Sequence, residues 1–185
     1  MKVKGTFFIA RREALTREFG ERAWSELLAD LAAQSGTFAR IVTPTSMVPV
    51  AEYLRFQEAL LTRFYADDLD AYWKVGVHAG RWALTEGPYR HLISQTADID
   101  SALAAILPKL WKINIDTGEL RFRREGDLVT VRIDEVDVWH PALELTTMGY
   151  AQATLELITG RKVVGKCVSG HAQGQLGCVY EFRLG

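Results

Sequence analysis

Residues 148–184, MGYAQATLELITGRKVVGKCVSGHAQGQLGCVYEFRL, have the pattern of a helix followed by two strands. An apolar stripe at helical spacing runs from Met148 to Ile158, and Gly160 is a typical residue at a helix end. We expect one strand over about Lys162–Val168 and a last strand over Cys178–Leu184. Alternation in the last strand predicts an inward-facing set, which comprises Cys178, Tyr180, Phe182 and Leu184.

A second hairpin is expected upstream of this helix. Apolar and polar residues alternate over 120–123 and again over 129–134, and the segment Arg124–Asp127 between them is typical of a turn. His140-Pro141 is suited to begin the intervening helix, because proline is favoured at the first helical position. The order hairpin, helix, hairpin predicts a four-stranded antiparallel sheet that helices cover on one side.

The first two thirds of the chain have helical periodicity. One apolar stripe is interrupted at Gly20, and further helices are expected over about 50–65, 69–83, 89–94 and 97–111. Thr43-Pro44-Thr45 and Val48-Pro49 are expected to form a turn, and Pro108 to bend or end the last helix near Leu107. The helix expected over 69–83 carries small residues on one face and should be central. The fold class is therefore α+β, with a helical N-terminal part packed on the sheet.

Length, composition and charge limit the function classes. The chain has 185 residues, of which 48% are hydrophobic, and no linker-like segment divides it, so we expect a single domain over 1–185. The net charge of -1 gives no general attraction to nucleic acid. No apolar run is long enough for a membrane span or a signal peptide. We expect a cytoplasmic protein, and two cysteines fit a reducing compartment.

Several short motifs, in this order along the chain, resemble a known family. They are Val3-Lys4-Gly5-Thr6-Phe7-Phe8, Phe19-Gly20-Glu21-Arg22-Ala23-Trp24, Val48-Pro49 with Tyr53, the segment Gly76–Ala83, Leu107-Pro108-Lys109-Leu110-Trp111, and Gly149-Tyr150 through Cys178-Val179-Tyr180-Glu181-Phe182. The family has unknown function, is expanded in myxobacteria, and is similar to the 4-vinyl-reductase and haem nitric-oxide-binding domains. The resemblance spans nearly the whole chain.

The resemblance implies a non-catalytic pocket between the helices and the sheet. The function expected from it is a small-molecule-binding or signalling module that takes an apolar or aromatic ligand, forms a homodimer and signals through an unidentified protein partner. The side chains expected to line the pocket are Trp73, Trp82, His91, Trp111 and Tyr150. For each tryptophan and for Tyr150, core packing is the competing interpretation. The alternative function is a protein-interaction scaffold of the same fold with no small ligand.

Haem is not expected on sequence grounds. The haem-binding relatives use a Tyr-x-Ser-x-Arg signature for the propionates, which is missing here, and iron needs an axial ligand such as histidine. The nearest helical candidate is His91, with Tyr89 and Arg90 beside it. A lone histidine on a short amphipathic helix is more often exposed or hydrogen-bonded than a ligand.

Structural zinc is the other cofactor considered. A hairpin would bring Cys167, His171 and Cys178 together as zinc ligands, and the aromatic-sensing domains that the chain resembles use cysteines in this region for zinc. The resemblance offers Glu144 as the fourth ligand, since those domains place a cysteine near its position. Here, however, the connection between the two cysteines is longer than the short Gly-Asp connection that relatives carry. Packing of Cys178 on the inward face, with Cys167 as its cross-strand neighbour, is the favoured interpretation, because zinc sites usually have tighter paired spacing.

No enzymatic activity is expected. The chain lacks a Gly-x-Ser-x-Gly motif, a phosphate-binding glycine-rich loop, a His-Glu-x-x-His motif and a Cys-x-x-Cys motif. The carboxylate pairs Asp67-Asp68 and Asp98-x-Asp100 lie where helix N-termini are expected, so capping explains them. Arg11-Arg12 forms a local basic patch, for which a solvated face or an acidic partner surface is the simplest explanation.

Overall fold

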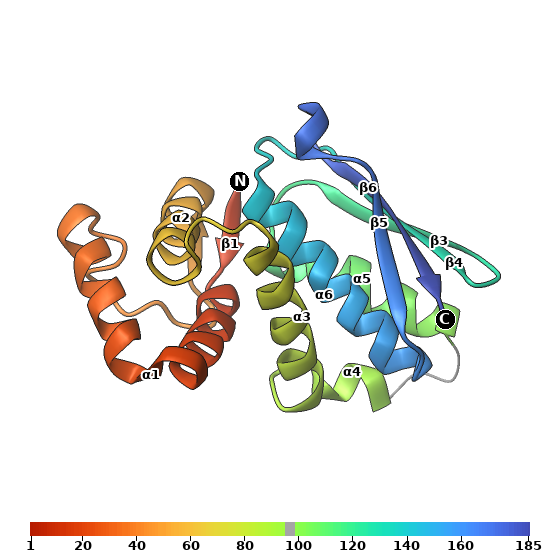
Figure 1. The fold of residues 1–185 in the computed structure, drawn as a ribbon, viewed down its shortest axis with the longest axis horizontal. Coiled ribbons are helices and arrows are strands. Elements are labelled where there is room, and N and C mark those ends of the chain that lie inside the picture. The colour runs from red at the N-terminus through yellow and green to blue at the C-terminus, as the bar shows by residue number, and fades with distance from the viewer. Residues whose placement is uncertain (95–98) are drawn as a thin grey trace.

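Helices pack on one four-stranded antiparallel sheet, which confirms the α+β class (Figure 1). The computed structural model describes residues 1–94 and 99–185. The helices are α1 (Thr6–Gln34), α2 (Val50–Tyr65), α3 (Asp70–Thr85), α4 (Arg90–Ser94), α5 (Ile99–Asn114) and α6 (Pro141–Thr159). The strands are β1 (Lys2–Lys4), β2 (Met47–Pro49), β3 (Glu119–Glu125), β4 (Leu128–Asp134), β5 (Val163–Ser169) and β6 (Cys178–Leu184), with a 3-10 turn η1 (His171–Gln173) before β6.

The last strand lies inside the sheet. The strand order is β3-β4-β6-β5, so β6 pairs with β5, its hairpin partner, and with β4 of the earlier hairpin. Val131 of β4 and Cys167 of β5 are both opposite Tyr180. The four alternate residues of β6 that were predicted to face inward are all buried. One strand thus joins the two hairpins into a single sheet.

Local sequence sets the limits of α6 as expected. The Nδ1 atom of His140 accepts a hydrogen bond of 3.1 Å from the backbone N–H of Ala142, which caps the first turn, and Pro141 occupies the first helical position. The helix ends at Gly160, which has the left-handed conformation with a φ of 64°. At the start of another helix, α3, Asp68 accepts a hydrogen bond of 3.0 Å from the backbone N–H of Asp70.

Helices α3 and α6 lie side by side at the centre of the molecule (Figure 1). Their backbones approach closely through glycine on both helices. A Cβ atom on Gly149 would lie 2.3 Å from the carbonyl oxygen of Trp73, and one on Gly76 would lie 2.3 Å from that of Thr146. The small face of residues 76–83 therefore serves close helix packing, and the prediction of a central helix is confirmed.

A small second sheet was not predicted. Strands β1 and β2 pair with each other, and Val3 lies opposite Val48, with both side chains buried. The expectation of a turn at Val48-Pro49 is therefore wrong. Three-residue strands are too short to show alternation, and only the tertiary pairing of residues more than 40 positions apart defines them. The interruption at Gly20 is confirmed, because its φ of 85° breaks α1 into two helical segments.

Proline does not end α5. The helix contains Pro108 and continues to Asn114, three residues past the expected end at Trp111. Proline removes the donor for the carbonyl of Ala104, but Ala104 is exposed, so water can replace that donor. The expected helix start at Ala97 and the capping carboxylate of Asp98 lie outside the described residues.

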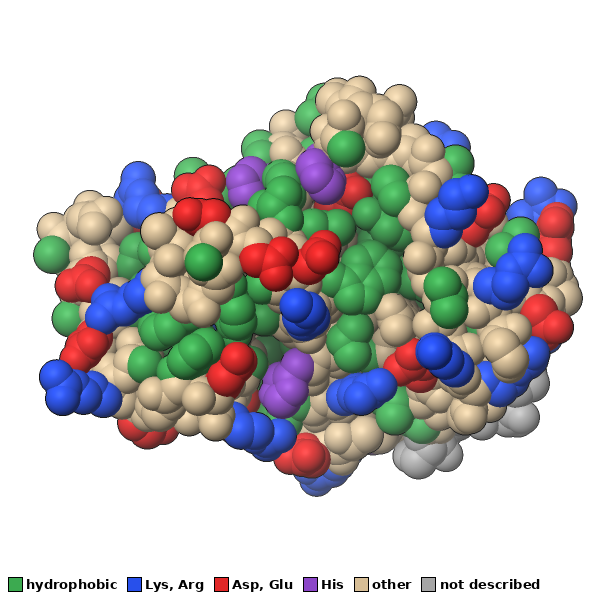
Figure 2. Space-filling view, viewed as in Figure 1, with side chains coloured by type: hydrophobic (Ala, Val, Ile, Leu, Met, Phe, Trp, Pro, Cys, Tyr) green, Lys and Arg blue, Asp and Glu red, His purple; other side chains and the backbone are tan. Residues whose placement is uncertain are grey.

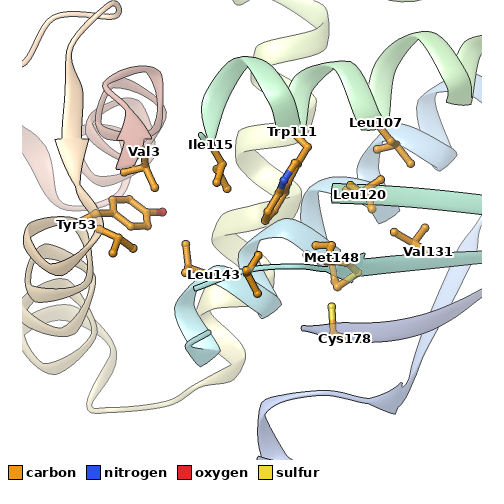
Figure 3. Packing of buried hydrophobic residues seen from close by; sticks show 14 of the residues in the cluster. Val3, Tyr53, Leu107, Trp111, Ile115, Leu120, Val131, Leu143, Met148 and Cys178 are labelled. Atoms are coloured by element: carbon orange, nitrogen blue, oxygen red, sulfur yellow. The ribbon is translucent and has the colours of Figure 1, made fainter. Parts of the chain in front are cut away.

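The main core connects the sheet to the N-terminal helices. In Figure 3, Trp111 and Leu107 extend from α5 towards Leu120 of β3 and Met148 of α6. Val3 of β1 and Tyr53 of α2 belong to the same cluster and lie on its other side. The visible face in Figure 2 carries charged side chains of both signs without a patch of one sign. In the described part of the chain, no helix combines the length and apolar content needed to cross a bilayer.

Candidate functional site

A cavity of about 80 Å³ lies where α1, α3, α5 and α6 meet. Its walls are mostly apolar and aromatic. They are formed by Thr6, Phe7, Ala10, Arg11, Ala79, Trp82, Ala83, Pro88, Tyr89, Leu107, Leu110, Trp111, Asn114, Ile115, Leu120, Thr146, Thr147 and Tyr150. An engineered cavity of roughly 150 Å³ admits benzene, so this space fits a small group unless a wall moves.

Helical spacing brings the lining residues together. On α1, Phe7, Ala10 and Arg11 are three and four residues apart and share one face, as Ala79 and Ala83 do on α3. On α5, Leu107, Trp111 and Ile115, which follows the helix, point to the same side in Figure 3. Most of the cavity wall is therefore built from helix faces, to which the turn residues Pro88 and Tyr89 and the strand residue Leu120 are added.

One polar group in the wall has its hydrogen bonds satisfied. Asn114 is buried, and its Oδ1 atom accepts hydrogen bonds from the hydroxyls of Thr6 at 2.5 Å and Tyr89 at 3.1 Å. Its amide nitrogen donates to the carbonyl of Leu110 at 2.8 Å. These bonds hold the end of α5 against the start of α1, so Asn114 has a structural explanation.

Two other polar side chains of the wall lack partners. The Arg11 side chain is buried, with 3% of the residue exposed, and its Nε atom has no hydrogen-bond partner within the described residues. The hydroxyl of Tyr150 is buried without a partner in the same part of the chain. Burial raises the pKa of Tyr150, so this hydroxyl is neutral. Moving the charge of an arginine from water into the protein interior costs on the order of several kcal/mol when no partner offsets it.

Three of the five residues predicted to line the pocket do line the cavity, and two do not. Trp82, Trp111 and Tyr150 line the cavity. Trp73 instead packs on the sheet, with its ring centroid 5.8 Å from that of Tyr180, and its indole nitrogen donates to Gln152 at 2.8 Å. His91 is exposed on α4 and does not contribute to the lining.

The two arginines of the pair Arg11-Arg12 also differ in their surroundings. Arg12 is exposed and pairs with Glu21 at 3.2 Å, as expected for a solvated face, whereas Arg11 faces the cavity and is buried. The expectation of a solvated patch is therefore wrong for Arg11. The spacing of Arg11 to Phe7, four residues earlier on the apolar face, was the signal in the sequence that could have identified it.

Two of the residues considered for zinc, Glu144 and His171, belong to a hydrogen-bond network. Glu144 is 1% exposed, and its carboxylate accepts hydrogen bonds from Trp139 Nε1 at 2.7 Å, Tyr180 Oη at 2.8 Å and the backbone N–H of His171 at 2.7 Å. The Nδ1 atom of His171 also lies 3.0 Å from this carboxylate. The carboxylate of Glu144 is therefore occupied by groups of the protein itself.

The two cysteines do not complete a metal site. Cys167 is exposed and opposite Tyr180, whereas Cys178 is buried and opposite Ile133 of β4, so the two are not direct cross-strand neighbours as expected. Within the described residues, no group of three or more histidine, cysteine, aspartate or glutamate side chains could hold a metal ion. In the part of the chain that the structure describes, Cys167, His171, Cys178 and Glu144 therefore do not come together as a metal site.

Comparison with solved structures identifies the architecture. An H-NOX protein from S. oneidensis in the Fe(II)NO ligation state superposes with a TM-score of 0.76 at 13% sequence identity, covering 98% of this chain and 99% of that one. This chain has the H-NOX fold. An Fe(II) unliganded H-NOX protein from K. algicida matches with a TM-score of 0.70 at 15% identity, covering 98% and 96% of the two chains. No protein-family model matches the sequence, and neither does any curated protein.

The H-NOX similarity corrects the expectation about haem. Solved proteins with this fold hold haem iron, among them one studied for the effect of porphyrin distortion on haem redox potential, with a TM-score of 0.70 at 12% identity. The missing Tyr-x-Ser-x-Arg signature and the position of His91 therefore do not justify setting haem aside. The H-NOX fold was nonetheless expected from the order of the motifs, and that expectation is confirmed.

The cavity itself does not fit a haem in this conformation. Its volume of about 80 Å³ is small, and its lining includes no histidine, cysteine or methionine. The side chains in the wall with oxygen atoms suited to iron are Tyr89 and Tyr150. Tyr89 already donates its hydroxyl to Asn114. A haem bound here would require the helices to separate.

Proposed function

We propose that this chain is a non-catalytic small-molecule-binding domain of the sensor type, with its ligand site in the cavity between α1, α3, α5 and α6. One observation carries the proposal. The cavity is apolar, yet the Arg11 and Tyr150 side chains in its wall carry buried polar atoms without a partner in the described residues. A cavity that served packing alone would be lined by apolar or satisfied groups.

The H-NOX fold supports the same proposal. One solved protein of this fold is described in an Fe(II)NO ligation state and another as Fe(II) unliganded, and the fold extends over 98% of this chain. Haem is therefore one ligand to be tested, together with smaller organic molecules. A fold does not determine function, so the occupant has to be measured.

Native mass spectrometry of freshly purified protein tests the proposal. We expect a mass increment from a non-covalent small molecule, or a stoichiometric complex after addition of a probe. Titration with hemin, followed in the visible absorption spectrum, tests the haem candidate in the same preparation. The native mass spectrum also reports the oligomeric state, for which a homodimer remains a prediction.

A cavity-filling variant locates the site. Ala79→Leu places three additional carbon atoms in the cavity wall, so we expect it to abolish the increment. Ala51→Leu is the matched control, because Ala51 lies on the exposed face of α2 and its variant should bind as the wild type does. Equal binding by both variants would place the ligand elsewhere. A protein that binds none of the probes would instead favour the alternative, an interaction scaffold with a filled core.

A further inference from the structure

Arg11 differs from the other arginines of α1 in its surroundings. Arg12, Arg17 and Arg22 are exposed, and each lies within 4.0 Å of a glutamate carboxylate. Arg11 is buried, and the described residues contain no carboxylate within ion-pair distance of its guanidinium. Arg11 therefore lines the cavity as a buried arginine whose Nε atom has no hydrogen-bond partner, and the described residues provide it with no counter-ion.

We propose that the ligand of this cavity is an organic monocarboxylate, whose acid group binds the guanidinium of Arg11 and whose apolar part lies against the aromatic wall. This inference rests on the proposed function and specifies the ligand class. The guanidinium presents several N–H donors in one plane, which match the two oxygens of a carboxylate. An arginine also keeps its positive charge when buried, so an anion is the partner that offsets it.

The protein groups near Arg11 do not supply this anion. The side chains whose pKa values its charge affects are Tyr65, Tyr72 and His78. Both tyrosine hydroxyls are already bound, and an imidazole supplies no negative charge. Tyr65 donates to Glu18 at 3.0 Å, and Tyr72 donates to the carbonyl of Gln57 at 3.2 Å. Glu18, the carboxylate on the following turns of α1, is therefore held by a tyrosine rather than by Arg11.

The rest of the wall selects the body of the ligand. Phe7, Trp82 and Trp111 offer apolar surfaces, and Arg11 is the single cationic side chain among the lining residues that the structure describes. One positive charge matches one carboxylate, whereas a dianionic phosphate would keep an uncompensated charge in an apolar space. The hydroxyl of Tyr150, which has no partner within residues 1–94 and 99–185, can bind one further polar atom of the ligand. The volume of about 80 Å³ favours a short aliphatic acid, and a single-ring acid would require a wall of the cavity to move.

Pairs of probes with the same shape and different charge test the proposal. Isothermal titration calorimetry with benzoate and benzamide, and with hexanoate and hexanamide, compares acid and neutral amide directly. We expect at least one acid to bind wild-type protein ten-fold or more tightly than its amide. Arg11→Gln should remove this preference, and Arg12→Gln, the adjacent arginine outside the cavity, should keep it.

Two further variants separate a role in binding from a role in folding. Arg11→Lys keeps a positive charge and should keep part of the acid preference. Arg11→Met should raise the Tm of the ligand-free protein, because it removes a buried charge that has no ion-pair partner among the described residues, while abolishing acid binding. A structural arginine would give the opposite shift in Tm.

The outcomes distinguish this inference from the proposed function. If wild-type protein binds the amides as tightly as the acids, or if Arg11→Gln keeps the acid preference, the monocarboxylate assignment is overturned and the cavity remains a ligand site. If neither acids nor amides bind, and native mass spectrometry shows no occupant, the proposed function itself is wrong.

Discussion

Tyr180 donates a hydrogen bond of 2.8 Å to the buried carboxylate of Glu144, which connects the central strand β6 to the first turn of α6. Trp139 and the backbone N–H of His171 donate to the same carboxylate. A Cβ atom on Gly170 would lie 2.3 Å from Glu144 Oε1, so the chain before η1 passes directly over this group. The segment considered as a zinc loop is thus closed around a hydrogen-bonded glutamate.

We predict that Tyr180→Phe destabilises the protein by about 1.5–3 kcal/mol, because a buried carboxylate loses one of its donors. Urea unfolding followed by circular dichroism measures the change. Tyr65→Phe is the matched control, since it removes a hydrogen bond to the exposed Glu18 and should cost about 1 kcal/mol or less. Equal losses in the two variants would show that the Glu144 network does not stabilise the fold.

Gly149→Ala should cost at least about 2 kcal/mol, because the added methyl group meets the carbonyl of Trp73 and forces α3 away from α6. Gly36→Ala is the control: its added Cβ atom has no neighbour within 4 Å, so its effect should stay below about 1 kcal/mol. Thermal unfolding of both variants is the measurement. A Gly149→Ala protein as stable as the control would contradict the close packing of these helices.

The two cysteines should differ in reactivity. Cys167 is exposed, whereas burial raises the pKa of the Cys178 thiol and keeps it protonated, with the nearby Glu144 acting in the same direction. We therefore expect a maleimide to label one thiol in the native protein and two after denaturation, as mass spectrometry can count. Labelling should disappear from the native state in Cys167→Ser. Rapid native labelling of Cys178 would show that β6 is not held inside the sheet.

Stability should fall in mild acid, partly through His78. Burial lowers the pKa of His78, and the positive charges of Arg17 and Arg11 lower it further, with Glu86 and Glu18 acting in the opposite sense. The unfolded chain then binds a proton more readily than the folded one, so this contribution to stability is complete above about pH 6.5 and is lost as the pH falls below it. Unfolding measured from pH 5 to 8 should show a shallower slope for His78→Gln. An unchanged slope would contradict the shift.

The C-terminal half of the fold could be predicted because its signals are local. Alternation in 178–184, the His140-Pro141 helix start and Gly160 as a helix end each depend on neighbouring residues, and the structure has all three. The β1–β2 sheet depends on residues more than 40 positions apart in very short strands, and periodicity does not detect such pairs. The continuation of α5 past Pro108 depends on solvent access to one carbonyl, which the sequence does not specify.

The candidate site was predicted in part for the same reason. Large aromatic side chains on helical stripes are visible in a sequence, and Trp82, Trp111 and Tyr150 do line the cavity. Trp73 has the same kind of spacing but packs on Tyr180 and Phe182 of the sheet. Which side of a buried helix faces a cavity and which faces a strand is decided by the neighbours on both sides.

By itself the sequence determined the longer helices and the hairpin–helix–hairpin order of the main sheet, because periodicity, capping and turn residues act over a few positions. The order of its motifs indicated the relation to the H-NOX fold. The tertiary structure alone decided that β6 lies between β4 and β5, that Glu144 is enclosed by hydrogen bonds, and that Arg11 is buried while Arg12 is solvated. Burial and the presence of a counter-ion arise from segments far apart in the chain, so the chemistry of this cavity appears only when α1, α3, α5 and α6 have packed together.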